Sequence, residues 1–226
     1  MLTFMRPTRP KTAAERKARV TRILELLDER YPNVTCELDH QNAWQLLVAT
    51  ILSAQCTDKR VNMVTPELFR RYPTVTDLAH AHPAEVSDLI RTTGFFNNKT
   101  KNIIGAAKML LAEHNGEVPR TMEDLLKVPG AARKTANVVL GTVYGIASGV
   151  VVDTHVQRIS QRLDLTKETT PEKIERDLMK TLPQDRWILF SHQLIHHGRR
   201  LCDARKPKCP ECPLDSLCYA KDKVTA

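Results

Sequence analysis

The sequence lacks long apolar runs and regular β-strand patterns. No stretch of its 226 residues approaches the ~20 consecutive apolar residues that a membrane-spanning helix requires. The first residues, MLTFMRPTRPK, carry charge but no apolar segment, which excludes a secretory signal peptide. The longest strand-like stretch is the apolar GVVV before Asp153. These absences favour a cytosolic protein of the all-α class, with many short helices and short connections.

Acidic residues are outnumbered by basic ones. The chain has 34 Lys and Arg against 26 Asp and Glu, which gives a net charge of +8. This balance favours an anionic partner, either nucleic acid or a membrane surface, although a solvated basic face on a housekeeping enzyme explains it equally well. A chain of this length buries a substantial core and folds as one domain or two small ones.

Apolar periodicity predicts the positions of the helices. Residues 1–11 form a basic, Pro-containing tail that we expect to be loosely ordered. Thr12 is placed to cap a helix that reaches Arg30, and the nearly continuous apolar stretch 42–53 is typical of a buried central helix. Asp58 is the expected cap of the next helix. Further helices are expected at about 77–79, 83–91, from Asn97 or Asn98 to about Asn115-Gly116, 132–140, 153–163, 171–182 and 187–197, the last ended by Gly198.

The stretch VPGAARKTA (residues 128–136) predicts a helical hairpin. Pro129 and Gly130 end the short helix before it, because proline cannot continue a helix and glycine accepts the angles of a tight turn. A second helix then begins near Ala132. Its N-terminal N–H groups point outward, and such an end binds phosphate without regard to base sequence. Lys134 stands in the first turn, where the helix dipole favours the neutral amine that nucleophilic attack requires.

Four of the six cysteines follow the spacing Cys202-X6-Cys209-X2-Cys212-X5-Cys218. Because the cytosol disfavours disulfides, this spacing indicates a metal centre. Four thiolates suit a structural zinc ion and a [4Fe–4S] cluster equally well. The remaining two cysteines, Cys36 and Cys56, are expected to be thiols of the core.

Basic residues surround the cysteine segment. A loop held by a metal loses little entropy when its cations bind phosphate, although some of these charges are expected to be merely solvated. Lys206 and Lys208 are the expected phosphate contacts because they lie between the first two cysteines. The basic residues of this region are Arg199, Arg200, Arg205, Lys206 and Lys208.

The hairpin and a later segment resemble a known family. VPGAARKTA is similar to the helix-hairpin-helix of the endonuclease III group of DNA base-excision glycosylases, and Val152-Asp153-Thr154-His155 is similar to the catalytic aspartate segment of that group. The resemblance extends over about residues 24–218 and includes the cysteine spacing, which implies a [4Fe–4S] cluster. It further implies a monomeric, bacterial cytoplasmic enzyme that is associated with the nucleoid through duplex DNA containing damaged bases or abasic sites.

The resemblance also implies an architecture of two lobes. Residues 12–34 and 149–226 would form the iron–sulfur cluster lobe. Residues 35–148 would form a helical barrel lobe that contains the helix-hairpin-helix. Lys134 and Asp153 would then face one another across the groove between the lobes.

Lys134 and Asp153 carry the reaction that the resemblance implies, which is that of a bifunctional glycosylase and AP lyase acting on oxidised pyrimidines. The Lys134 amine would attack the sugar C1′, the base would leave, and β-elimination from the Schiff base would cut the strand. Burial and the helix N-terminus are both expected to favour the neutral amine. Asp153 would stabilise positive charge on the sugar, although an aspartate just before a helix is also a common N-cap. His155 has no assigned role.

Two turns resemble the segments with which the family opens the duplex. In SAQCTD (residues 53–58), Gln55 would fill the gap left by an extruded base, whereas without the family a polar residue in a turn is the simpler interpretation. In TGFFNNK (residues 93–99), Phe95 stands where the family usually has an aliphatic residue, and its ring can stack on bases. At the hairpin, the DNA contacts would come from Gly130, Ala132, Arg133 and Thr135.

Ala132 departs from the family, which usually has glycine at this position. Glycine would let the backbone approach phosphate closely, whereas alanine would clash with DNA or make a left-handed conformation cost about 1 kcal/mol. We therefore expect Ala132→Gly to tighten DNA binding and raise activity several-fold. The melting temperature is expected to stay unchanged or fall slightly, because alanine is the better helix former.

Three alternatives remain open. An adenine-mismatch glycosylase would carry a glutamate in the long buried helix, but residues 47–52 contain no acidic residue. A weakly active or non-catalytic helix-hairpin-helix paralogue would bind DNA without being trapped on it by borohydride. A zinc protein with an unrelated role would be distinguished by metal analysis.

Overall fold

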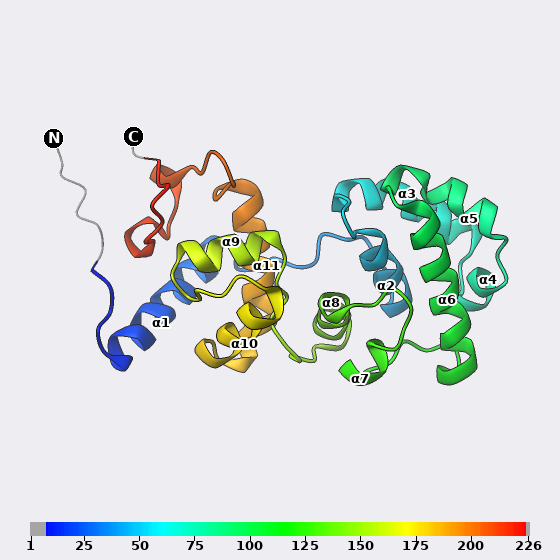
Figure 1. Ribbon diagram of the computed structural model, residues 1–226, viewed down its shortest axis with the longest axis horizontal. Helices are drawn as coiled ribbons and strands as arrows, with labels where there is room; N and C mark the ends of the chain where they lie inside the picture. Colours follow the sequence, from blue (N-terminus) through cyan, green and yellow to red (C-terminus); the bar gives the residue numbers. More distant parts are fainter. Residues whose placement is uncertain (1–7, 225–226) are drawn as a thin grey trace. The chain divides into compact units, whose positions relative to one another are not determined.

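The computed structural model describes residues 8–224, and within this range the chain forms helices and loops without a β-strand. The all-α class expected from the sequence is therefore confirmed. The chain divides into two compact units (Figure 1). The terminal unit contains the described residues up to Thr35 and from Gly149 onward, and the central unit contains Cys36–Ser148. No helix in the described part is long and apolar enough to cross a membrane.

The helices of the central unit are connected by short loops. In chain order they are α2 (Ala43–Leu52), α3 (Asp58–Arg71), α4 (Val75–Ala79), α5 (Pro83–Ile90), the 3₁₀ turn η1 (Arg91–Thr93), α6 (Phe96–His114), α7 (Met122–Leu125) and α8 (Arg133–Tyr144).

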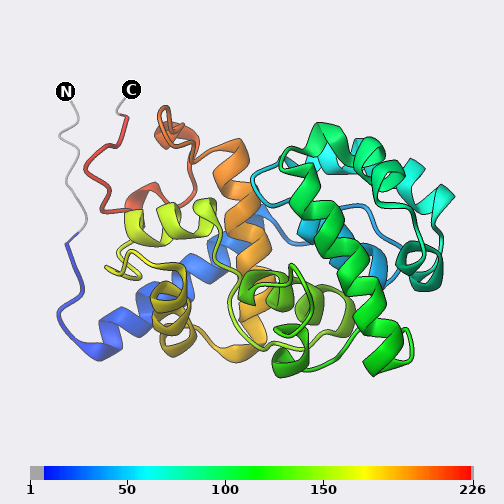
Figure 2. The ribbon, with the colours of Figure 1, turned by 45° about the vertical axis from the view of Figure 1, so that its right-hand side comes forward.

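Helix α2 forms the centre of this unit. The Asn42 side chain caps it by accepting a hydrogen bond from the Gln45 N–H at 2.9 Å, and almost every later residue of the helix is buried. Helices α3, α6 and α8 pack against α2, and α6 also packs against α4 and α5 (Figures 1 and 2). Burial on several sides explains why the sequence of α2 is apolar all round.

The terminal unit combines both ends of the described chain. Its helices are α1 (Ala13–Arg30), α9 (Thr154–Arg162), α10 (Pro171–Thr181), η2 (Gln184–Arg186), α11 (Trp187–Arg200), η3 (Cys209–Glu211) and η4 (Asp215–Leu217).

Helix α11 is the common packing partner in the terminal unit, because both α1 and α9 lie against it. Leu27 of α1 and Phe190 of α11 are fully buried. An ion pair between Asp28 and Arg186 also joins the N-terminal helix to the C-terminal segment, and the Gln193 amide donates to the same carboxylate at 2.9 Å. The two distant parts of the sequence therefore share one core.

The predicted N-terminal tail is described only in part, since residues 1–7 lie outside the described residues. The Thr8 carbonyl accepts a hydrogen bond from the Tyr219 hydroxyl at 3.1 Å. Arg9 forms an ion pair with Asp164 at 3.2 Å and lies over the Tyr219 ring. Residues 8 and 9 are thus held against the terminal unit.

Gly198 does not end α11, contrary to the sequence prediction, because the helix continues to Arg200. A Cβ at Gly198 would lie 2.6 Å from Nδ1 of His155, which is far inside van der Waals contact. The glycine therefore allows α9 to pack closely on α11, and this requirement outweighs its poor helix propensity.

Two predicted helix starts are also corrected. Thr57 rather than Asp58 caps α3, because its hydroxyl accepts from the Arg60 N–H at 3.3 Å. Helix α6 begins at Phe96 rather than at Asn97 or Asn98. Both differences are one or two residues, as expected for helix ends.

Candidate nucleic-acid interface and metal centre

The hairpin between α7 and α8 has the geometry that its sequence predicts. Ala131 N–H donates to the Val128 carbonyl at 3.0 Å and closes the turn. Gly130 adopts φ +81°, which L side chains rarely do, and a Cβ there would lie 2.8 Å from Cβ of Asn102. Glycine is therefore required at position 130 both by the backbone and by the contact with α6.

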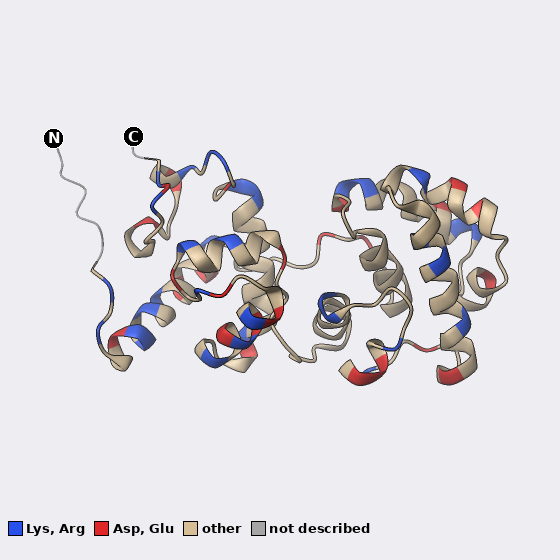
Figure 3. Ribbon diagram, in the orientation of Figure 1, with Lys and Arg blue, Asp and Glu red and all other residues tan. Residues whose placement is uncertain are grey.

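Lys134 is the second residue of α8, and its side chain is exposed. The expectation that burial favours the neutral amine is therefore wrong for the protein alone. Lys134 nevertheless lies at the N-terminus of α8, where the helix dipole opposes a positive charge. The first two residues of α8, Arg133 and Lys134, are both basic (Figure 3).

Ala132 is the N-cap of α8, with φ −83° and ψ 171°. This extended conformation suits any residue, so the expected left-handed strain is absent. Ala132 makes no side-chain cap hydrogen bond, and its side chain is exposed. The argument from helix propensity also fails, because an N-cap residue lies outside the helix and glycine is better than alanine there.

Thr135 is only 7% exposed. Its side chain therefore offers little surface to DNA. The N–H groups of the first helical turn have no acceptor within the helix, so a contact from this residue to phosphate would come from its backbone.

Gln55 and Phe95 share an unusual backbone conformation. Their φ angles are 53° and 48°, in the left-handed region that costs an ordinary L residue roughly 1–2 kcal/mol. Gln55 is exposed in the turn between α2 and α3, and Phe95 is 63% exposed just before α6. Asn115 and Asp164, the other two such residues in the described chain, are of types that tolerate this region. The strained, exposed positions are thus the two that the family resemblance predicts to enter DNA.

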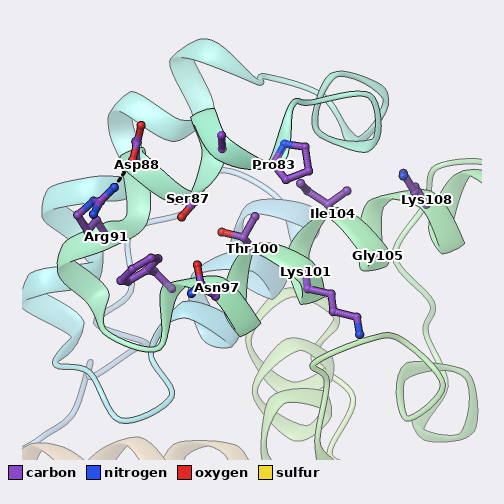
Figure 4. A pocket seen from close by; sticks show the side chains of 12 residues that line it. Pro83, Ser87, Asp88, Arg91, Asn97, Thr100, Lys101, Ile104, Gly105 and Lys108 are labelled. Atoms are coloured by element: carbon purple, nitrogen blue, oxygen red, sulfur yellow. Dashed lines mark hydrogen bonds and ion pairs between the residues drawn. The ribbon is translucent and has the colours of Figure 1, made fainter.

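A pocket of about 730 Å³ lies between α5 and α6, next to the turn that carries Phe95 (Figure 4). At one end Arg91 pairs with Asp88 at 2.5 Å and lies over the Phe96 ring. Lys101 and Lys108 line the pocket from α6. Apolar periodicity does not predict this pocket, because its lining comes from two helices and only the fold shows that they pack together.

Asp153 is the N-cap of α9. Its Oδ1 atom accepts hydrogen bonds from the N–H groups of His155 and Val156, both at 2.8 Å. The capping role foreseen as an alternative is therefore confirmed. Asp153 and Lys134 belong to different units, and their juxtaposition across a groove stays a prediction.

His155 has a structural role, through contacts that the sequence did not reveal. Besides packing against Gly198, its Nδ1 atom lies 3.0 Å from an Arg158 guanidinium nitrogen. Burial lowers the pKa of His155, and the charge of Asp153 acts in the opposite direction. These contacts tie the start of α9, and with it Asp153, to α11.

The four spaced cysteines line one cavity in the terminal unit. All four are free and partly buried. Among residues 8–224, no three Cys, His, Asp or Glu side chains gather closely enough for a single metal ion. The two remaining cysteines, Cys36 and Cys56, are half-buried rather than buried, which corrects the expectation of core thiols.

The surroundings of this cavity control the charge on its sulfurs. Burial raises the pKa of Cys212 to about 12 and also raises the pKa of Cys218. The Arg162 guanidinium donates to the Cys202 sulfur at 3.1 Å. His197, whose pKa burial lowers to about 4, lies 3.5 Å from the Cys212 sulfur. Thiols in such a site ionise when a metal supplies the compensating charge.

The basic loop before Cys209 is rigidly tied. The Asp203 carboxylate accepts from the N–H groups of Arg205 and Lys206 at 2.8 and 3.1 Å. Lys208 N–H donates to the Leu201 carbonyl at 2.9 Å. Because Lys206 and Lys208 are exposed, the loop presents its cations to solvent from a fixed backbone (Figure 3).

Comparison with known proteins places these features in a family. Residues 48–184 match the HhH-GPD superfamily base excision DNA repair proteins. The endonuclease III of Synechocystis sp. is 59% identical over 205 residues, which are 91% of this chain and 94% of that protein. The endonuclease III of Bacillus subtilis is 42% identical over 201 residues, which are 88% and 91% of the two chains.

A solved structure, described as a non-covalent endonuclease III–DNA complex, is similar with a TM-score of 0.85 and 42% identity, covering 89% of this chain and 94% of that one. The chain therefore belongs to the endonuclease III family of helix-hairpin-helix base excision DNA repair glycosylases and lyases.

Proposed function

We propose that this DNA glycosylase and AP lyase removes oxidised pyrimidines, such as thymine glycol, from duplex DNA and uses Lys134 as its nucleophile. The observation that carries the proposal is the placement of Lys134. It is an exposed amine in the first turn of α8, directly after a hairpin built to present backbone N–H groups. Phosphate bound at those N–H groups would bring the sugar of a neighbouring nucleotide towards the amine.

The chemistry follows from an amine acting on a glycosidic carbon. The Lys134 Nζ forms a bond to C1′ while the bond from C1′ to the base breaks, and the base leaves with the electron pair and takes up a proton. The amine then loses a proton, and its nitrogen lone pair expels O4′ from C1′. The ring opens, O4′ takes up a proton, and a protonated Schiff base links Lys134 to the opened sugar. Loss of a proton from C2′ expels the 3′ phosphate, and this β-elimination cuts the strand.

Asp153 is proposed to act electrostatically and in proton transfer. One of its oxygens caps α9 with two hydrogen bonds, which fix the direction of the carboxylate. A carboxylate held in this way stabilises the positive charge that develops on the sugar as the base leaves. Capping and catalysis are therefore compatible roles of the same side chain.

Gln55 and Phe95 are proposed to hold the duplex open. A base must leave the helical stack before its glycosidic bond is accessible, and the gap must then be filled. Both side chains project from strained turns of the central unit. The Phe95 ring supplies a stacking surface and the Gln55 amide supplies hydrogen bonds for an unpaired base. Phosphate contacts at the hairpin are assigned to Gly130, Ala132, Arg133 and Thr135.

The endonuclease III family carries an iron–sulfur cluster, and we assign a [4Fe–4S] cluster to the terminal unit of this chain. Four sulfurs around one cavity match the donor set of such a cluster. Cys202, Cys209, Cys212 and Cys218 would hold it. The cluster would cross-link the segment after α11, and the loop with Lys206 and Lys208 would gain a rigid base for phosphate contacts.

The proposed partner is double-stranded DNA that contains damaged bases or abasic sites, bound by a monomer in the bacterial cytoplasm. The net charge of +8 supports such a partner. A related solved structure at 42% identity is a complex of an endonuclease III with DNA.

A duplex with one thymine glycol tests the proposal. Purified protein should release the base and leave a nick whose 3′ end is the unsaturated aldehyde of β-elimination. An otherwise identical undamaged duplex is the control and should remain intact. Release of the base without a nick would show that the protein has glycosylase activity but no lyase activity. Binding without either product would leave the chain as a DNA-binding paralogue.

A further inference from the structure

Lys99 is a buried amine that the proposed reaction does not use. It stands in the first turn of α6 and is 4% exposed. Lysine is rarely buried to this extent, and the N-terminal turn of a helix disfavours a cation. Burial lowers the pKa of this amine, in agreement with the cost of its position. A residue placed at such cost is expected to have a specific task.

The Lys99 amine holds the loop that presents Phe95. Its Nζ donates to the Thr93 carbonyl at 2.8 Å, and this hydrogen bond is buried. The Thr93 hydroxyl in turn donates to the Ile90 carbonyl at 2.8 Å. Two residues with positive φ follow, Gly94 at 71° and Phe95 at 48°. The wedge loop (residues 93–95) is thereby anchored at Thr93 just before it enters its strained conformation.

Besides these contacts, the wedge loop is held by the Lys99 backbone N–H, which donates to the Phe95 carbonyl at 3.1 Å. Phe95 occupies the N-cap of α6 without a side-chain cap hydrogen bond. Gly94 N–H reaches the Arg91 carbonyl only at 3.4 Å, and the Phe95 ring is 63% exposed. Without the Lys99 hydrogen bond, Gly94 and Phe95 could leave the left-handed conformation. The Phe95 ring could then turn towards the protein surface, for example towards the pocket that Phe96 and Asn97 line (Figure 4).

Lys99 also lies near the second strained turn. The Cys56 sulfur interacts electrostatically with the amine, and Cys56 directly follows Gln55, whose φ is 53°. One buried amine therefore lies near both of the turns whose side chains are proposed to enter DNA. Both turns belong to the central unit.

From this geometry we infer that Lys99 is a positioning residue, which fixes the wedge loop so that Phe95 is presented for insertion into the base stack. The inference rests on the proposed function, because it requires Phe95 to act on DNA. Lys99 itself does not touch the reacting atoms. Its contribution is preorganisation, since a loop that is already in its binding conformation loses less entropy on binding.

The test is a double-mutant cycle between Lys99 and Phe95, read as single-turnover release of thymine glycol from a duplex. Lys99→Met keeps the length of the side chain but removes the donor and the charge. We expect it to slow base release by about tenfold, the effect of one lost hydrogen bond to a charged group. In a Phe95→Ala background, the same change should have almost no further effect, because the positioned ring is missing.

Tyr72→Phe is the matched control. It removes a hydrogen bond from the Tyr72 hydroxyl to Glu85 at 2.8 Å in the same unit, and neither residue belongs to the wedge loop. This change should lower the melting temperature without slowing base release. If Lys99→Met does not fold, Lys99→Gln, which keeps a shorter donor, enters the same cycle.

The outcomes separate the inference from the proposed function. Equal slowing by Lys99→Met in both backgrounds, or no slowing in either, overturns the positioning role. Unchanged base release by Phe95→Ala overturns the wedge role and with it the inference. Absence of base release by the unmodified protein would instead contradict the proposed substrate.

Discussion

Asn102 of α6 fills the space that a side chain on Gly130 would need, since a Cβ at Gly130 would lie 2.8 Å from the Asn102 Cβ. The hairpin thus packs closely on α6 at Gly130, a residue that has no side chain. Gly130→Ala must both hold a left-handed backbone and displace Asn102. We expect it to lower the free energy of unfolding by about 2–4 kcal/mol and to weaken DNA binding.

Gly145→Ala is the control for this prediction. Gly145 has φ +65° but no atom within 4 Å of an added Cβ, so only the backbone cost of about 1 kcal/mol applies. Denaturant unfolding of the two variants measures the difference. Equal destabilisation would show that Asn102 moves aside without cost and that this contact does not hold the hairpin on α6.

Gly198→Ala should destabilise the terminal unit although alanine is the better helix former. The added Cβ would lie 2.6 Å from Nδ1 of His155, and overpacking of this kind costs typically 1–3 kcal/mol against a gain of up to about 1 kcal/mol in helix propensity. Denaturant unfolding checks the sign. A more stable variant would mean that α9 and α11 are not packed as tightly as described.

Ala132 now leads to a sharper prediction than the sequence allowed. Because Ala132 is an exposed N-cap in an extended conformation, Ala132→Gly should leave the melting temperature unchanged or raise it slightly. It should still tighten DNA binding several-fold, since only the methyl group stands in the way of phosphate.

Ala132→Ser separates the two effects. Serine caps the helix and should stabilise the protein by about 1 kcal/mol, while its larger side chain should not improve binding. Binding isotherms and thermal unfolding of both variants provide the measurement. Equal or weaker binding by Ala132→Gly would show that the hairpin is adapted to alanine.

Lys206 and Lys208 are expected to set part of the salt dependence of DNA binding. Replacing both by glutamine should reduce the slope of log K against log salt by about two units if each contacts one phosphate. Lys173→Gln with Lys180→Gln on α10 removes the same charge elsewhere in the terminal unit. Identical slopes for the two double variants would show that the loop does not contact DNA.

Much of the fold could be predicted from the sequence because its signals are local. The apolar stretch 42–53, and Gly130 after Pro129, each act within a few residues. The four cysteines were recognisable because their spacing within one short segment is itself a local signal. For the same reason the N-cap role of Asp153 was foreseen.

The failures concern contacts between distant residues. Gly198 was read as a helix end because its partner, His155, lies on another helix. Lys134 was expected to be buried, but exposure depends on what surrounds a helix end and not on its sequence. The sequence did not distinguish Lys99 from the other residues of α6, since only the fold brings its amine to the Thr93 carbonyl.

The most direct test of the central claim is borohydride trapping on a thymine-glycol duplex, with Lys134→Gln compared with Lys127→Gln. Lys127 is an exposed lysine just before the same hairpin, so its replacement controls for lost charge. We expect the unmodified protein and Lys127→Gln to form a covalent complex with DNA, and Lys134→Gln to bind the duplex without becoming cross-linked. A full yield of covalent complex with Lys134→Gln would contradict the assignment and place the nucleophile elsewhere.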